Sequence, residues 1–167
     1  MNYWPAFSCN LAECFEPYAR FLAAFRPRTR GLVADYLTKH GLGPVPADGE
    51  APDIWCVGTA VYPYMVCGGP GGHSGPGTAG LTTCNFIDWW AFMRDKDALR
   101  RHIWPVVHGT ADFFNRCVRN VDGKWLSAFS ASPEQMERGV EDTWDWRKSV
   151  YPPYYTSVGC AFDQSMI

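Results

Sequence analysis

The segment ALRRHIWPVVHGTADFFNRCV, residues 98–118, carries the strongest regular pattern in the chain. Its buried-type side chains recur at steps of three and four residues: Leu99, Ile103, Val106, Val107, Thr110, Phe113, Phe114 and Cys117. An α-helix turns once every 3.6 residues, so this spacing gathers them on one face. We predict a long amphipathic helix here, with Pro105 either bending it or marking its true start.

Helical patterns also cover much of the rest of the chain. Residues 8–25 and 28–40 show the same spacing on either side of Pro27, which predicts two helices with a short break between them. Residues 78–92 predict another helix, and residues 158–167 read as the opening of one more. A short turn at residues 120–123 leads into an extended stretch at residues 125–129. Paired helices with little strand predict an all-α fold.

One long segment, residues 41–77, interrupts the helices. It holds ten of the sixteen Gly and is rich in Pro, which predicts a long irregular loop containing one short strand. Loops longer than about 15 residues inside a compact domain are usually functional. We therefore expect the aromatic cluster of Trp55, Tyr62 and Tyr64 to lie near a site.

The charge and motif content argues against several classes of partner and cofactor. The formal net charge is −2 and the charges are mixed along the chain, so nucleic acid and anionic membrane surfaces are not expected partners. No apolar stretch reaches the roughly 18 residues of a membrane span. Residues 75–80 fit G-x-G-x-x-G but follow no strand, and His102 and His108 are six residues apart, a spacing that does not place them on one helical face. We expect neither a cofactor nor a metal.

The seven Cys form no C-x-x-C pair and no compact disulfide spacing, so we interpret them as mostly buried thiols. A thiol enzyme is one alternative, for example with Cys67 and His73 paired in space. Nothing in the local sequence activates either residue.

The aromatic content suggests a different chemistry. Eight Trp are a heavy load for 167 residues, and part of this surface could stack on a ligand. The Ser132-Pro-Glu-Gln135 sequence has the pattern of a helix start and places Glu134 ahead of an aromatic run. Sugar hydrolysis needs such a carboxylic acid near ring-stacking surfaces. Taken alone, Glu134 also fits an ordinary first-turn residue stabilised by the helix dipole.

Three separated motifs resemble glycoside hydrolase family 95, the α-L-fucosidase family. They are Met1-Asn-Tyr-Trp-Pro5 followed by Asn10-Leu-Ala-Glu13, then Ser130-Ala-Ser-Pro-Glu134-Gln, then Gly159-Cys-Ala-Phe-Asp163-Gln164. They stand in the family's order, and residues 92–123 between them also resemble the family's helices and turn. The resemblance covers nearly all of the chain outside the loop at residues 41–77.

The resemblance implies a fold. Family members form an (α/α)6 toroid, a ring of six helix pairs also called a six-hairpin glycosidase. About half of the required helices are visible here, so we expect residues 1–167 to be an internal fragment of the catalytic domain, an incomplete toroid with one long irregular loop.

The resemblance also implies an activity, which is inverting hydrolysis of a terminal glycosidic bond in an oligosaccharide or glycan. The family's general acid is the Glu of its Ser-Pro-Glu segment, which falls on Glu134. The family's base is an Asp that lies well downstream of this segment, and two Asn that assist it precede the first motif. Neither the base nor the Asn pair is present in residues 1–167, so we expect the chain alone to be inactive. From composition and position we add Trp4, Trp55 and Tyr62 as sugar-facing rings.

The chain departs from the family pattern within residues 78–92. A Trp and a His-Tyr pair are expected where Leu81 and the Trp89-Trp90 pair stand, so the sugar could be an α-L-fucose or a related unit. A non-catalytic carbohydrate-binding or scaffold protein that kept the helices is the alternative function. The resemblance alone suggests an extracellular or periplasmic location.

Overall fold

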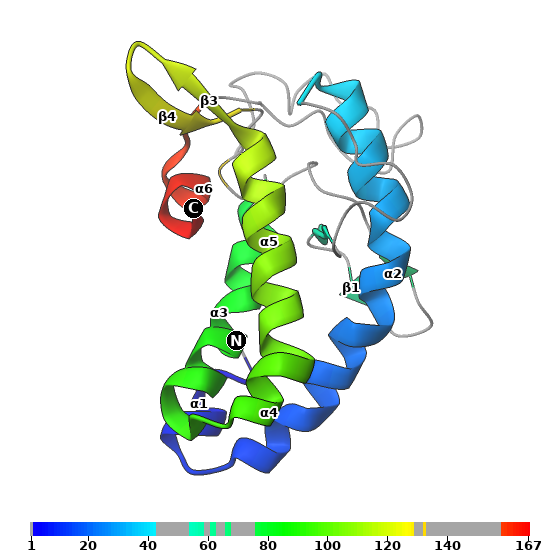
Figure 1. The fold of residues 1–167 in the computed structure, drawn as a ribbon, viewed down its shortest axis with the longest axis vertical. Coiled ribbons are helices and arrows are strands. Elements are labelled where there is room, and N and C mark those ends of the chain that lie inside the picture. Colours follow the sequence, from blue (N-terminus) through cyan, green and yellow to red (C-terminus); the bar gives the residue numbers. More distant parts are fainter. Residues whose placement is uncertain are drawn as a thin grey trace, which may run out of the picture.

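A computed structural model describes residues 2–42, 54–58, 61–62, 66–67, 76–128, 132 and 158–167. Helices dominate this part of the chain, and the strands form two small two-stranded sheets, which confirms the predicted all-α class (Figure 1). None of the described helices is long and apolar enough to cross a membrane.

The N-terminal third folds as two short helical turns and one long helix. The turns are α1 (Pro5–Ser8) and the 3-10 helix η1 (Ala12–Phe15), and the long helix is α2 (Glu16–Lys39). The predicted break at Pro27 is wrong, because α2 runs through this residue on a curved course (Figure 1).

Packing explains why α2 tolerates an internal proline. Pro27 is exposed, and a proline inside a helix costs roughly 3 kcal/mol. Four large apolar side chains of the same helix are almost fully buried, two before the proline and two after it: Leu22, Phe25, Val33 and Leu37. Each contributes about 1.5–3 kcal/mol on burial, so together they outweigh the local cost.

The second half of the described chain contains the helices that carry the core. They are α3 (Gly77–Met93), the single turn α4 (Lys96–Ala98), the π-helical turn η3 (Leu99–Ile103) and α5 (Trp104–Cys117). Residues 98–117 are therefore helical as predicted, and α5 itself begins at Trp104 with Pro105 in its first turn. Ile103 and Trp104 both have helical backbone, so Pro105 marks a change from a π-helical to an α-helical turn and not the start of the helix.

Short strands complete the fold. β1 (Val61–Tyr62) and β2 (Val66–Cys67) pair antiparallel within the long loop, and β3 (Val118–Val121) and β4 (Lys124–Ser127) form a hairpin. The hairpin turns at Asp122 and Gly123, both with positive φ, as a two-residue type I′ connection requires. The chain then returns as α6 (Ala161–Met166), the helix opening predicted near residue 167.

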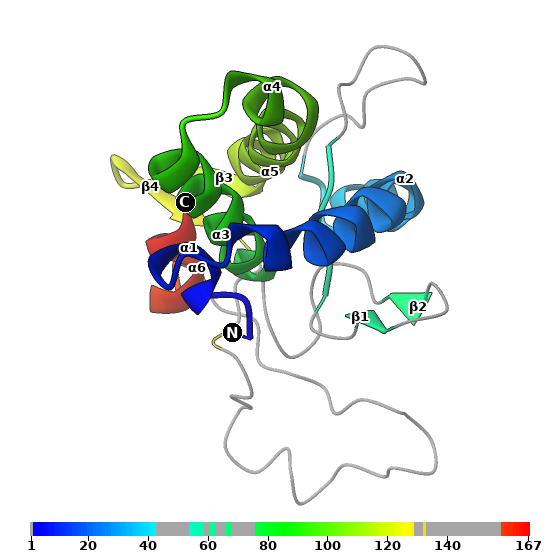
Figure 2. The same cartoon turned by 90° about the horizontal axis from the view of Figure 1, so that it is seen from below.

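Two apolar clusters share the interior. One joins α1, η1 and the first turns of α2 to α3 and α5, and the other joins the end of α2 to α3 and the end of α5. Residues 54–57 link the clusters: Trp55 and Val57 belong to the first, and Ile54 and Cys56 belong to the second. This alternation is that of an extended segment. Figure 2 shows α3, α5 and α6 gathered on one side with α2 extending to the other.

Candidate functional site

The four site residues predicted from the sequence lie in different environments in the structure. Trp4 is 49% exposed just before α1, so its ring is accessible to a ligand. Tyr62 lies in β1, and its side chain is outside the described part of the molecule. Glu134 also lies outside the described residues, as does the helix start predicted around it.

Trp55 requires a correction. Its side chain is fully buried in the core, and its indole N–H donates a hydrogen bond to the Val106 carbonyl at 2.9 Å. A ring with no exposed face cannot stack on a sugar. Trp55 therefore holds residues 54–58 against α5 instead of lining a sugar site, as an aromatic residue in a loop between two packed clusters can do.

The two ends of the segment that carries Glu134 are held close together. Ala128 N donates to Cys117 O at 2.8 Å, which fixes the point after β4. Gly159 N donates to Ser127 O at 2.8 Å, which brings the chain back to the same point. Both boundaries of residues 129–157 are thus fixed beside the β3–β4 hairpin.

The motif at residues 159–164 makes these attachments. Gln164 accepts a hydrogen bond from Ser127 N at 2.6 Å through Oε1, and its Nε2 donates to Trp125 O at 3.3 Å. Asp163 is fully buried, and its Oδ1 accepts from Gly77 N, the first residue of α3, at 2.7 Å. A carboxylate at a helix N-terminus satisfies an unpaired N–H group and interacts favourably with the helix dipole. One motif therefore fixes both the start of α3 and the hairpin.

Two glycines make room for this arrangement. A Cβ at Gly77 would lie 2.6 Å from Asp163 Oδ1, and one at Gly80 would lie 2.6 Å from Met166 Cβ. The helices α3 and α6 approach closely only because these positions lack side chains. Sequence reasoning treated residues 75–80 only as a failed dinucleotide motif. Two glycines three residues apart, one at the end of the predicted loop and one in the predicted helix, were the available signal for close packing.

The buried thiols near Asp163 are poor nucleophiles. Burial, together with the Asp163 carboxylate, raises the pKa of Cys117 to about 12. Burial also raises the pKa of Cys56 well above its ordinary value. Because the thiolate is the reactive form, neither residue supports a thiol mechanism. Cys67 and His73 cannot be assessed as a pair, since their side chains are outside the described part.

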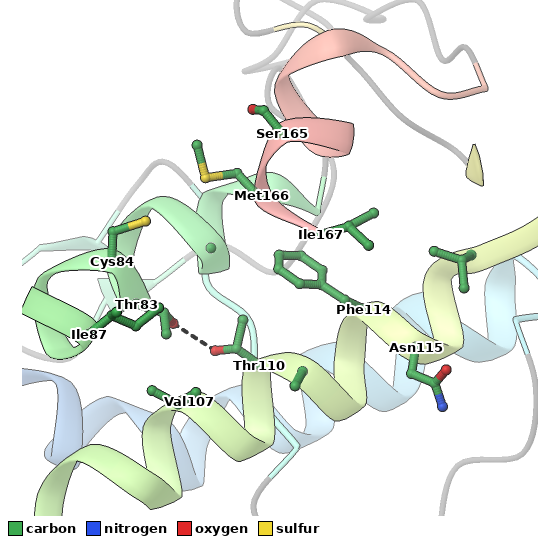
Figure 3. Close-up of a pocket in the computed structure, with 13 residues that line it drawn as sticks. Thr83, Cys84, Ile87, Val107, Thr110, Phe114, Asn115, Ser165, Met166 and Ile167 are labelled. Carbon is green, nitrogen blue, oxygen red and sulfur yellow. Dashed lines mark hydrogen bonds between the residues drawn. The ribbon is translucent and has the colours of Figure 1, made fainter. Parts of the chain in front are cut away.

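Two hollows are described on the surface, the first of them beside the contact between α3 and α6. The first, here called the α3–α5 groove, has a volume of about 570 Å³ and a largely apolar lining that includes Ile87, Val107, Phe114 and Met166 (Figure 3). A hydrogen bond of 2.8 Å between Thr83 and Thr110 joins the two helices along it.

The second hollow, here called the charged pocket, has a volume of about 340 Å³. It lies where η1 and the start of α2 meet the end of α3 and the turns that follow it. Its charged and polar lining residues are Glu13, Glu16, Arg20, Asp95, Arg101 and His102. Trp89 and four alanines supply the rest of its lining. Sequence reasoning missed this pocket, because its residues come from separate segments with no shared motif.

The described residues contain no group of three or more His, Cys, Asp or Glu side chains placed to hold a metal ion. The candidate site considered below is the junction of α3, α6 and the hairpin. The Glu134 segment begins at this junction and ends at it.

Comparison with known proteins gives one finding. A family model described as the glycosyl hydrolase family 95 catalytic domain matches residues 1–167. The match therefore includes the motifs at residues 1–13 and 159–164, and the motif around Glu134 that lies between them. No curated protein and no solved structure gives a significant match.

Proposed function

The chain belongs to glycosyl hydrolase family 95, a family of glycoside hydrolases, and on that premise we propose that it contributes the general acid of an inverting exo-glycosidase. Glu134 is the proposed acid. The observation that carries this proposal is the family match over residues 1–167, which includes the Ser-Pro-Glu sequence at residues 132–134. The proposed substrate is a glycan with a terminal α-L-fucose or a related sugar.

Inverting hydrolysis divides the work between two carboxyl groups. The acid protonates the glycosidic oxygen as it leaves, and a base on the opposite face of the sugar activates water. The two groups stand roughly 6.5–9.5 Å apart in inverting enzymes, which leaves room for that water. Glu134 must be protonated at the working pH, so apolar or aromatic surroundings have to offset the effect of a helix N-terminus on its pKa.

The attachments of the Glu134 segment support this role. Hydrogen bonds from Ala128 and Gly159 fix the two boundaries of residues 129–157 beside α6 and the start of α3. A catalytic acid has to be held to within a fraction of an ångström, and fixed boundaries contribute to that precision.

The family resemblance places the general base downstream of the Ser-Pro-Glu segment, and no residue of this chain is assigned to it. We therefore propose that the 167-residue chain by itself does not turn over substrate. We also propose that the described helices are part of an (α/α)6 toroid. Trp4, which is exposed, and Tyr62 remain proposed sugar-facing rings.

The sugar specificity is expected to differ from that of a typical family member. Leu81 is 37% exposed on α3, at the position where the family pattern has a tryptophan. Trp89 stands where the pattern has a histidine and stacks between Phe7 and His102. An aliphatic residue in place of an indole removes a surface on which a sugar ring can stack.

The test is Glu134→Gln in the full-length gene product, assayed with two aryl glycosides whose leaving groups differ in acidity. Loss of the acid should lower the rate at least about a hundredfold with the poor leaving group. The rate should change much less with a dinitrophenyl leaving group, which departs without a proton. Glu137→Gln is the matched control, since it removes a carboxyl three residues away in the same segment.

Equal losses with both leaving groups would remove Glu134 from the role of acid. The anomeric configuration of the first product, followed by proton NMR before mutarotation, should be opposite to that of the substrate. Retention would overturn the inverting mechanism. Glycan binding by a full-length protein that hydrolyses none of the glycosides would favour the non-catalytic alternative.

A further inference from the structure

The charged pocket lies far along α3 from the junction that holds the Glu134 segment. Its residues from this helix and the turn after it, Trp89 and Asp95, are at the C-terminal end, whereas Asp163 contacts Gly77 at the N-terminal end. A helix rises 1.5 Å per residue, so the 12 residues from Gly77 to Trp89 span roughly 18 Å. The charged pocket is therefore separate from the attachments of Glu134.

Several polar groups of this pocket are available to a ligand. Glu13 makes no hydrogen bond or ion pair to any described residue. The indole N–H of Trp89 likewise donates to no described residue, although its ring is half-buried between Phe7 and His102 at centroid distances of 6.4 and 5.9 Å. The stack fixes the indole in place. Among the described residues, the pocket thus has a free carboxylate at Glu13 and an indole held in place at its wall.

The charges around the pocket are mixed. Arg20 pairs with Glu16 at 2.5 Å, and Arg101 lies 4.0 Å from Asp97. Asp95 uses its Oδ1 to accept the N–H groups of Asp97 and Ala98. An anionic ligand would meet carboxylates, and a cationic ligand would meet arginines, so neither is favoured. A neutral ligand with both donors and acceptors fits this lining best.

The apolar lining residues and the volume of the charged pocket further limit the kind of ligand that fits it. Ala12, Ala19, Ala23 and Ala98 line the pocket with small apolar side chains, which can contact the C–H groups of a sugar ring. A volume of about 340 Å³ is near the lower end of the roughly 300–1,000 Å³ of ligand pockets.

We infer that the charged pocket binds a neutral saccharide unit, with Glu13 accepting from a hydroxyl group and Trp89 donating to one. The pocket is separate from the attachments of the Glu134 segment and holds part of a glycan without cleaving it. The inference does not depend on the role of Glu134.

The test is a titration of the ¹⁵N-labelled 167-residue chain with methyl pyranosides of the gluco, galacto and fuco series, followed on the indole N–H signals. The Trp89 signal, identified by its loss in Trp89→Phe, should shift saturably with at least one glycoside in the millimolar range. Glu13→Ala should weaken that binding about tenfold or more, because a hydrogen bond to a charged acceptor is lost. Trp104→Phe is the matched control, since Trp104 is exposed outside the pocket.

Two results would overturn the inference. One is a Trp89 signal that does not move with any of the glycosides at 200 mM. The other is a shift of the same midpoint in Glu13→Ala as in the unaltered chain. Glu134→Gln should leave the midpoint unchanged, so this result and the hydrolysis test succeed or fail separately.

Discussion

The two ends of α3 differ in almost every physical respect. At the N-terminal end, Gly77 and Gly80 are buried and α6 packs directly against the helix backbone. At the C-terminal end, Phe92 and Met93 are half or more exposed, and the side chains surround a charged pocket. The first end is built from small residues and one buried carboxylate, and the second from large rings and exposed charges.

This difference separates positions that can change from positions that cannot. Protein interiors are close-packed, so an added methyl group at a backbone contact forces a shift of the neighbouring element. At an exposed end a side chain can move into solvent instead. The N-terminal end of α3 is therefore expected to carry stability, while the C-terminal end is free to vary with the ligand.

The largest effect on stability is expected at Asp163. Asp163→Ala leaves the buried N–H of Gly77 without its acceptor and should lower the free energy of unfolding by about 3 kcal/mol. Asp163→Asn keeps an acceptor oxygen and loses the interaction of the charge with the helix dipole, so it should cost less. Urea unfolding measures both. Equal losses in the two variants would show that the charge matters and the hydrogen bond does not.

A smaller effect is expected from adding a methyl group at the same end. In Gly80→Ala the new Cβ would meet Met166 Cβ and lie 3.0 Å from Phe114 Cζ, so α6 must move. We expect a loss of about 1–2 kcal/mol. Gly31→Ala in α2 is the control, because nothing lies within 4 Å of that position and alanine favours a helix by up to about 1 kcal/mol. If the unfolding midpoints of Gly80→Ala and Gly31→Ala shift in the same direction, the proposed difference between the two positions is wrong.

The smallest effect is expected beside the C-terminal end, at Asp95. Hydrogen bonds from Ala98 N and then Asp97 N hold the pKa of this exposed carboxyl below its ordinary value. A carboxyl with a depressed pKa contributes stability above its unfolded pKa, about 3.9, and the contribution is lost as pH falls through the folded value. The difference in unfolding midpoint between the wild type and Asp95→Asn should shrink below about pH 4. A difference constant from pH 7 to pH 2 would exclude this coupling.

Much of the helical fold could be predicted from sequence, and most directly at residues 104–117, whose pattern reflects a single buried face. The break predicted at Pro27 failed because a local rule was outweighed by burial on both sides of the proline. Trp55 was misplaced because an aromatic residue in a loop has the same local sequence whether it faces a ligand or the core.

The sequence predicted only those parts of the site that belong to a recognisable motif. The resemblance identified the segments around Glu134 and Asp163, and the family match confirmed the family. The contact between Asp163 and Gly77 joins residues 86 positions apart, and neither local sequence predicts it. The charged pocket combines η1, α2 and α3 in the same way, so its chemistry appears only in three dimensions.

The π-helical turn η3, residues 99–103, has a consequence for how the gene can change. A π turn accommodates one residue more than an α turn between the same flanking helices. Deleting one codon there would keep the buried faces of α4 and α5 in register, but it would place Pro105 inside a continuous α-helix at a cost of roughly 3 kcal/mol. Single-codon deletions within α3 or α5 would rotate everything beyond them by about 100° and be removed by selection. The extra residue of the turn is therefore expected to be retained wherever a proline follows it at this position.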